Sequence, residues 1–319
     1  MKPQLALAYF GVVLIWTTTP LAIKWSSIGV SYVFGATGRM SIGLACLLVL
    51  LLLRRKGLPC HRLALRTYLA VSMQIYASML ITYWSARFVP SGWISVIFGL
   101  GPFMTAFMAA AYLKERSLGW RKLAAYSLGA FGLAVMFSSA RELHPMAIQG
   151  TLGILLATFI HAASAVWVKQ IDAKLPSVQQ ITGGLLISVP LYWLTWLILD
   201  DGALPTQIQP QTLYAIVYLG VVATTLGFAL YYYVLGQLPA TDVAMMNLMT
   251  PVLSLLLGYL ANREPITMKT VVGTSLIMAA LALHQRADRA SLPVRIAKSK
   301  NRRAKKTGAA NAAPVSNPT

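Results

Sequence analysis

Long apolar stretches alternate with short polar segments along almost the whole chain. Ten of these stretches approach the roughly 20 residues that an α-helix needs to cross a bilayer core about 30 Å thick. The segments between them combine charges with Pro and Gly, as in RRKGLPCHR and NREPITMK, which is typical of short connections. We therefore predict ten transmembrane helices, near residues 4–23, 32–53, 66–86, 91–113, 120–139, 149–169, 181–199, 211–236, 242–261 and 269–284.

The composition supports a membrane protein. Of the 319 residues, 57% are hydrophobic and only 11% are charged, whereas a soluble domain carries roughly a quarter charged residues. Because no globular core could bury so much apolar surface, the membrane must be the solvent of this chain. The predicted fold class is therefore all-α and integral to the membrane.

The positive charge is distributed unevenly over the predicted loops. If the N-terminus is cytoplasmic, 21 of the 27 Lys and Arg residues fall in cytoplasmic segments, five fall in outer loops, and Arg39 lies inside a span. Such a bias is a strong positive-inside signal, so both termini should be cytoplasmic. The formal charge of +19 therefore orients the protein and requires no nucleic acid as partner.

The C-terminal segment 286–319 is basic and has no apolar periodicity. We predict that it is a disordered cytoplasmic tail. Two roles remain open for it: a contact with anionic membrane lipid, or simply a solvated segment that helps to fix the topology.

The two halves of the chain contain an internal repeat. Segment 83–120 aligns without gaps with segment 232–269, at a constant offset of 149 residues. Four pairs recur at this offset: Tyr83 with Tyr232, Pro90 with Pro239, Pro102 with Pro251, and Glu115 with Glu264. A proline that recurs twice, once inside an apolar span, is a specific signal.

The repeat divides the chain into a first five-helix unit, 1–145, and a second one, 146–285. Because each unit has an odd number of spans, the second unit must enter the membrane in the inverted orientation. Inverted repeats are a hallmark of secondary transporters, whose two halves rock about a site near the middle of the membrane. The pattern therefore predicts transport of a small-molecule substrate by alternating access.

The motifs in these units resemble a known family. The segments LIWTTTPLAIKW, FGATGRMSIGLACLLVLLLL and FVPSGWISVIFGLGPFMTAFMAAAYLKERSL are similar to one unit of the drug/metabolite transporter superfamily, the EamA-type bacterial permeases. The segment LGFALYYYVLGQLPATDVAMMNLMTPVLSLLLGYLANREPIT matches the same pattern.

The resemblance implies a ten-helix permease of the bacterial inner (plasma) membrane, often an exporter of small metabolites, that works as a monomer or a homodimer. It also implies that the first, third, fourth, sixth, eighth and ninth helices line a central cavity. The substrate class stays open between amino acids or other carboxylated solutes, on one side, and cationic drugs or nucleobases, on the other.

Arg39 is the one charge deep inside a predicted span, about 12 Å from its outer end at 1.5 Å per residue. A central arginine costs about 2.5–3.5 kcal/mol on insertion scales, so its side chain should face the interior of the bundle. Gly35, Gly38 and Gly43 surround it and would let a neighbouring helix approach closely. Arg39 could bind a substrate carboxylate or lock the second helix to its neighbours. The seventh span has no counterpart of it.

Aromatic and polar side chains on the cavity-lining helices are the candidate substrate-binding residues. Trp84, Trp93 and Trp167 lie near span ends and fit an interfacial belt better. Pro102 and Pro251 should interrupt their helices and free backbone carbonyls near the site. The candidates are Trp16, Thr18, Arg39, Gln74, Tyr76, Tyr83, Phe98, His161, Tyr232, Asn247 and Thr250.

The acidic residues and the cysteines exclude other functions. All eight Asp and Glu residues lie at span ends or in loops, so the identity of the coupling ion stays open. Glu115 and Glu264 should close helix ends or pair with Lys114, Arg116 or Arg263.

Cys46 and Cys60 lack the spacing of a metal site. H-E-x-x-H and nucleotide-binding loop motifs are missing, so we expect no enzyme activity, no metal and no cofactor. An integral-membrane enzyme is the least favoured alternative.

Overall fold

A computed structural model describes residues 3–112, 120–235, 237–238 and 240–287. All secondary structure in these ranges is helical. A final helix, residues 268–287, carries no label. The labelled elements are α1 (Pro3–Trp25), α2 (Tyr32–Leu53), α3 (Arg62–Ser72), η1 (Met73–Ser78), α4 (Met79–Ser85), α5 (Ser91–Phe98), α6 (Gly101–Tyr112), α7 (Trp120–Leu143), α8 (Ala147–Ile171), α9 (Ser177–Leu199), α10 (Pro210–Tyr218), η2 (Leu219–Leu226), α11 (Gly227–Leu235) and α12 (Ala240–Asn262).

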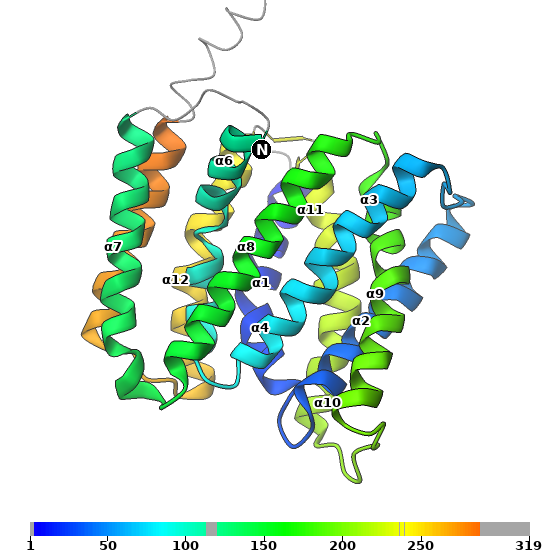
Figure 1. Cartoon of the computed structure of the whole chain (residues 1–319), viewed down its shortest axis with the longest axis horizontal. Helices are drawn as coiled ribbons and strands as arrows, with labels where there is room; N and C mark the ends of the chain where they lie inside the picture. Colours follow the sequence, from blue (N-terminus) through cyan, green and yellow to red (C-terminus); the bar gives the residue numbers. More distant parts are fainter. Residues whose placement is uncertain (1–2, 113–119, 236, 239, 288–319) are drawn as a thin grey trace, which may run out of the picture.

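These elements form ten consecutive rods in the described ranges, and the all-helical prediction is confirmed (Figure 1). The third rod consists of α3, η1 and α4, the fourth of α5 and α6, and the eighth of α10, η2 and α11. Eight helices are long and apolar enough to cross a membrane. Residues 62–85 and 268–287 supply the other two rods. The rods begin and end within a few residues of the predicted spans.

The largest contacts between labelled rods recur when each rod is exchanged for the rod five places away. The first rod contacts the eighth and ninth through α11 and α12, and the sixth rod contacts the third and fourth through α4 and α6. The second rod packs on η2 of the eighth, and the seventh packs on α3 of the third. The pairs α2–α9 and α5–α12 each map onto themselves.

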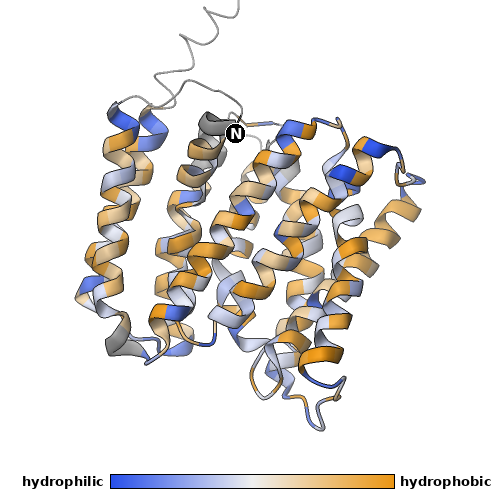
Figure 2. Cartoon of the chain, in the orientation of Figure 1, coloured by the Kyte–Doolittle hydropathy of each residue, from blue (hydrophilic) through white to orange (hydrophobic). Residues whose placement is uncertain are grey.

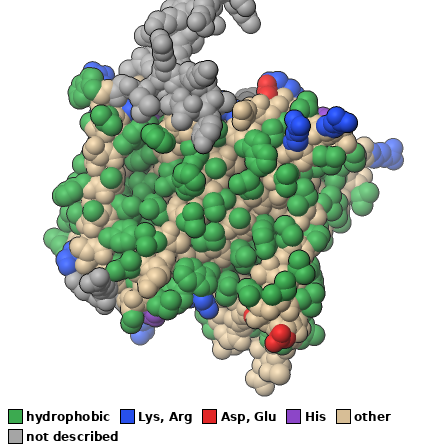
Figure 3. Space-filling model, in the orientation of Figure 1, with side chains coloured by type: hydrophobic (Ala, Val, Ile, Leu, Met, Phe, Trp, Pro, Cys, Tyr) green, Lys and Arg blue, Asp and Glu red, His purple; other side chains and the backbone are tan. Residues whose placement is uncertain are grey.

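The outer surface of the bundle is apolar, as expected for a chain in lipid. Apolar residues predominate along the rods and polar residues gather at their ends (Figure 2). Leu7 and Leu53 are each 77% exposed, although a soluble protein would bury most such side chains. Lys and Arg side chains gather at the end of the bundle where α3 begins (Figure 3).

The two repeated prolines differ in their effect on the helix. The fourth rod is interrupted at Gly99 and Leu100, just before Pro102. The interruption expected at Pro251 is absent, because α12 runs through this proline from Ala240 to Asn262. Glycines flank the first break, and glycine weakens a helix by about 1 kcal/mol relative to alanine. At the second site the residue before the proline is Thr250, whose Oγ1 donates to the Met246 carbonyl at 2.8 Å.

Two π-helical segments, η1 and η2, occupy related places in the two units. At the repeat offset of 149, Met73 corresponds to Val222, so the two segments overlap. A π-helix shifts the backbone hydrogen bonds by one residue and is frequent at functional sites. Each segment packs on the second helix of the other unit, η1 on α9 and η2 on α2.

Candidate functional site

Arg39 lies in the interior of the bundle, where only 8% of its surface is exposed. Its Nε donates to Thr224 Oγ1 at 3.3 Å, and Thr224 Oγ1 donates in turn to the Leu219 carbonyl at 2.8 Å. This contact joins α2 to the π-helical η2. Arg39 Nη1 is buried and has no hydrogen-bond partner. The guanidinium is therefore anchored on one side and keeps an unused donor on another.

Glycines allow α2 and the eighth rod to approach closely around Arg39. A Cβ on Gly43 would lie 2.9 Å from Thr224 Cγ2, and one on Gly38 would lie 3.0 Å from Ile216 Cγ2. From the opposite side, a Cβ on Gly220 would lie 2.6 Å from Ile42 Cγ2. The small residues thus bring Thr224 within reach of the arginine.

Tyr192 is a fully buried residue that connects α9 to η1, the other π-helical segment. Its hydroxyl donates to the Ile75 carbonyl at 2.8 Å and to the Tyr76 carbonyl at 3.3 Å. The ring of Tyr76 packs edge-to-face on Tyr192 at 5.1 Å, and the Tyr76 hydroxyl shares a hydrogen bond with Thr195 at 2.6 Å. Tyr76 therefore joins the third and seventh rods. Thr37 Oγ1 of α2 donates to the Tyr192 carbonyl at 3.4 Å, so Tyr192 also contacts the helix that carries Arg39.

Tyr83, further along the third rod, is fully buried, and its hydroxyl has no hydrogen-bond partner. It lies on the same rod as Tyr76, about two helical turns further along. Arg39 Nη1 and Tyr83 OH are thus two buried donors without an acceptor. Buried polar groups are normally paired, so each such exception calls for an explanation such as a ligand.

A chain of hydroxyl groups links three rods at the level of the α1 threonines. Ser95 Oγ donates to Ser254 Oγ at 2.9 Å, and Ser254 Oγ donates to the Thr17 carbonyl at 2.9 Å. It joins α5, α12 and α1. Ser95 and Ser254 are not among the predicted site residues, because isolated serines in apolar helices give no distinctive sequence signal.

Three of the remaining candidates form ring pairs and one forms a hydrogen bond between rods. Ring pairs join Trp16 to Tyr231 at 5.2 Å and Phe98 to His161 at 5.9 Å. Thr18 shares a hydrogen bond with Tyr218.

Gln74 and Asn247 are half-buried, and Thr250 bonds only to its own helix. The Tyr232 side chain lies outside the described residues. The candidates therefore lie on several rods, and of them Tyr76 contacts Tyr192 directly.

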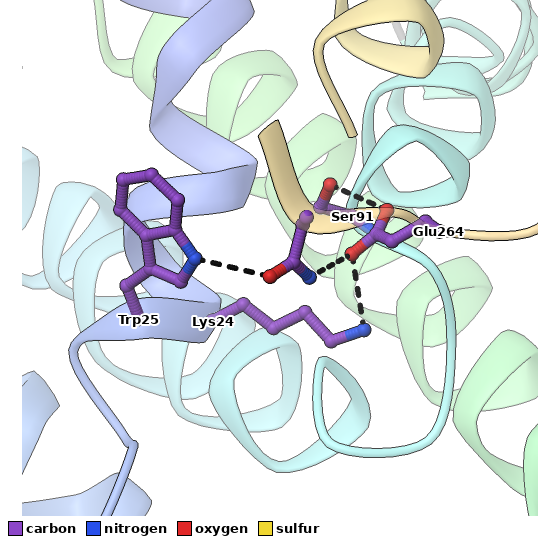
Figure 4. Close-up of polar contacts among 5 residues, drawn as sticks. Lys24, Trp25, Ser91 and Glu264 are labelled. Atoms are coloured by element: carbon purple, nitrogen blue, oxygen red, sulfur yellow. Dashed lines mark hydrogen bonds and ion pairs between the residues drawn. The ribbon is translucent and has the colours of Figure 1, made fainter. Parts of the chain in front are cut away.

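Glu264 closes the N-terminal end of α5, one of its two expected roles, because it accepts from the backbone N–H of Ser91. It pairs with Lys24 at 3.2 Å, rather than with Arg263, and only 7% of it is exposed. The backbone N–H and the Oγ of Ser91 donate to Glu264 Oε2 at 2.7 and 2.8 Å. Asn262 Nδ2 donates at 2.9 Å to Oε1, the oxygen that pairs with Lys24 (Figure 4). Glu115, its repeat partner, lies outside the described residues.

Trp93, expected in the interfacial belt, is fully buried instead, and its Nε1 has no partner. It lies at the beginning of α5, one helical turn from Pro90. Position near a span end indicates an interfacial tryptophan only when the helix faces lipid there, and α5 packs between α1, α8 and α12.

Comparisons with known proteins agree with this architecture. The EamA-like transporter family matches residues 148–284. An "Uncharacterized transporter YoaV" of Bacillus subtilis (strain 168) is 24% identical over 283 residues, covering 88% of this chain and 96% of that protein. A "Probable amino-acid metabolite efflux pump" of Salmonella typhimurium is 28% identical over 203 residues, covering 61% of this chain and 68% of that protein.

The family match and these relatives support the resemblance to the drug/metabolite transporter superfamily. A crystal structure described only as that of a protein matches it with a TM-score of 0.61 at 19% identity, over 89% of this chain and 98% of that one, which shows the fold alone. This chain is a multi-pass membrane transporter. Its polar interior around Arg39 and Tyr192 is the candidate site for a small-molecule substrate.

Proposed function

We propose that this transporter exports small carboxylated metabolites, with amino acids and their derivatives as first candidates, by alternating access of two inverted units, 1–145 and 146–285. The observation that carries the substrate class is the Arg39 guanidinium, buried in the bundle with Nη1 unpaired. A guanidinium binds a carboxylate through two parallel hydrogen bonds. Relatives named as amino-acid metabolite efflux pumps support the same class and direction.

The exchangeable packing of the rods supports the mechanism. Contacts between α2 and α9 and between α5 and α12 lie where the two units meet. Two equivalent halves can adopt each other's conformations, so a site between them opens to either side in turn. The break before Pro102 lies between α5, which packs on α12, and α6, which packs on α8. In this proposal, the cytoplasmic termini follow from the charge bias and the bacterial inner membrane follows from the family resemblance.

Transport by the purified chain in proteoliposomes tests the function directly. Proteoliposomes loaded with a radiolabelled amino acid should release it faster than protein-free vesicles with the same load. Unlabelled carboxylated solutes should compete with the labelled amino acid for transport. Arg39→Gln should keep the fold and bind the solute about ten- to a hundredfold more weakly, since a hydrogen bond to a charged group is worth about 1.5–3 kcal/mol.

Arg66→Gln is the matched control, because Arg66 is exposed on α3 and its loss should leave transport unchanged. If the folded Arg39→Gln protein transports as well as the wild type, the arginine serves only to pack the helices. If no carboxylated solute moves but a cationic drug or a nucleobase does, the substrate class is wrong.

A further inference from the structure

A cavity of about 320 Å³ lies at the end of the bundle that contains Lys24, beside the Glu264 ion pair. This volume is near the lower limit of ligand pockets, which enclose about 300–1,000 Å³. The polar side chains that line it are Lys24, Trp25, Ser27, Tyr83, Arg87 and Asn262. The charge bias predicts that this end faces the outside of the cell.

The lining of this cavity is chemically suited to an anion. It contains two cations, Lys24 and Arg87, and no acid. Arg87 lies 4.6 Å from the centre of the Tyr32 ring and donates to the Trp84 carbonyl, and it forms no ion pair with any residue in the described ranges.

The buried hydroxyl of Tyr83 adds a donor without a partner. A carboxylate would satisfy this group and gain both positive charges.

Two of the residues that line the cavity also hold Glu264. Lys24 Nζ and Asn262 Nδ2 both donate to Glu264 Oε1, at 3.2 and 2.9 Å. Asn262 is itself positioned by Trp25, whose Nε1 donates to its Oδ1 at 3.2 Å (Figure 4). A carboxylate in the cavity would therefore meet the same donors that Glu264 uses.

We propose that this cavity binds the carboxylate of the departing solute, and that the solute takes Lys24 and Asn262 from Glu264 as it binds. Glu264 then acts as an internal competitor that holds this end of the transporter closed until a solute arrives. The inference rests on the proposed function for the identity of the solute.

The exchange explains how binding could open the bundle. Glu264 follows α12, Lys24 lies on α1 and Ser91 begins α5, so one carboxylate ties three rods together. When the solute replaces Glu264 on Lys24, Glu264 keeps Ser91 but loses its link to α1. This loss weakens the attachment of the first rod to the ninth, on which it packs.

Protection of a cysteine tests binding in this cavity without requiring transport. Ser27→Cys, made in full-length protein that also carries Cys46→Ser and Cys60→Ser, places one thiol in the lining. Labelling by a polar maleimide in detergent is followed with every standard amino acid except cysteine, and with the C-terminal amide of each. At about ten times its Kd, a bound solute slows labelling about tenfold by mass action. The acids should protect and the amides should not.

Two further variants separate competition from a merely structural role. Arg87→Gln should abolish protection, while Arg66→Gln should not. Glu264→Gln removes the competing charge and should lower the solute concentration needed for protection. Ser91→Ala loosens Glu264 and should act in the same direction if Glu264→Gln does not fold.

The inference is overturned if no amino acid protects, if the amides protect equally, or if Glu264→Gln and Ser91→Ala both weaken protection. Release of amino acids from proteoliposomes by the wild type is measured on the same preparation. If release occurs without protection, this inference alone fails. If protection occurs without release, the proposed function fails and the cavity remains a binding site.

Discussion

At the scale of single residues, the buried tyrosines differ in how their hydroxyl groups are satisfied. Tyr192 OH donates to two carbonyls of η1, whereas Tyr83 OH has no partner, although both side chains are fully buried. Removing a paired hydroxyl leaves a buried carbonyl unsatisfied, at a cost of about 1–3 kcal/mol. Removing an unpaired one costs nothing.

We therefore expect Tyr83→Phe to melt at or above the wild-type temperature and Tyr192→Phe to melt clearly below it. Thermal unfolding of the purified proteins in one detergent makes the comparison. Although it should be at least as stable as the wild type, Tyr83→Phe should bind amino acids more weakly, because it lacks the free hydroxyl donor. Equal destabilisation by both substitutions would mean that Tyr83 OH has a structural acceptor.

The Lys24–Glu264 ion pair is expected to contribute more to stability than a surface pair. The side chains are 26% and 7% exposed, so the pair lies between the exposed class, worth about 0.2–1 kcal/mol, and the buried class, whose disruption costs about 3–5 kcal/mol. A double-mutant cycle with Lys24→Met and Glu264→Gln should give a coupling free energy of about 1–3 kcal/mol.

The exposed pair Lys174–Asp172 is the control, because it is shorter, at 2.8 Å, yet 81% and 61% exposed. Its coupling free energy should stay below about 0.5 kcal/mol. Coupling of similar size in the two cycles would show that burial does not strengthen the Glu264 pair.

At the scale of the elements, the close contact between α2 and η2 depends on Gly220. A methyl group there would lie 2.6 Å from Ile42 Cγ2 and 3.0 Å from the Arg39 carbonyl, so Gly220→Ala must push the two helices apart. Overpacking of this kind typically costs about 1–3 kcal/mol. It should also lengthen the Arg39–Thr224 contact and weaken solute binding.

Gly101→Ala is the matched control, since its nearest new contact would be Thr158 Cγ2 at 3.7 Å. Thermal unfolding should show a lower melting temperature for Gly220→Ala and an unchanged or higher one for Gly101→Ala, because alanine favours a helix. A neutral Gly220→Ala would mean that the rods shift without strain.

The rods and the internal features of the rods were predictable to different degrees. Helix ends follow from hydropathy and from Pro and Gly, which act locally, so α2 begins and ends at the predicted residues 32 and 53. The π-helical segments and the continuity of α12 through Pro251 depend on which side chains satisfy the displaced carbonyls. Some of these partners are distant in the chain, since Tyr192, which binds the Ile75 carbonyl of η1, lies 117 residues from it.

The candidate site shows the same division. Arg39 was recognisable because a charge in an apolar span is costly in lipid. Tyr192 was not, since a tyrosine among apolar residues equally fits lipid-facing or core positions. The partner of Glu264 was also missed: Lys24 lies 240 residues away in the chain, and only the fold brings them together.

At the scale of the whole molecule, the exchangeable packing and the charge bias are separate features. The exchangeable packing concerns how five rods meet five others, and it would be the same in either orientation of the protein in the membrane. Only the charge bias assigns Lys24 and Glu264 to the outer end. The direction of export and the placing of the proposed gate therefore depend on the orientation.

The orientation can be measured with one native and one introduced cysteine. Cys60 is exposed in the loop between α2 and α3, which the charge bias places in the cytoplasm. Thr206 is exposed in the loop between α9 and α10, which should lie outside. With Cys46→Ser in both proteins, an impermeant maleimide added to intact spheroplasts should label Thr206→Cys in the Cys60→Ser background at once. It should label Cys60 only after the membrane is permeabilised, because the predominance of Lys and Arg on that side retains those loops in the cytoplasm. The opposite labelling would reverse the molecule and make the Lys24–Glu264 pair the gate on the cytoplasmic side, so that solute would meet Glu264 on entry rather than on departure.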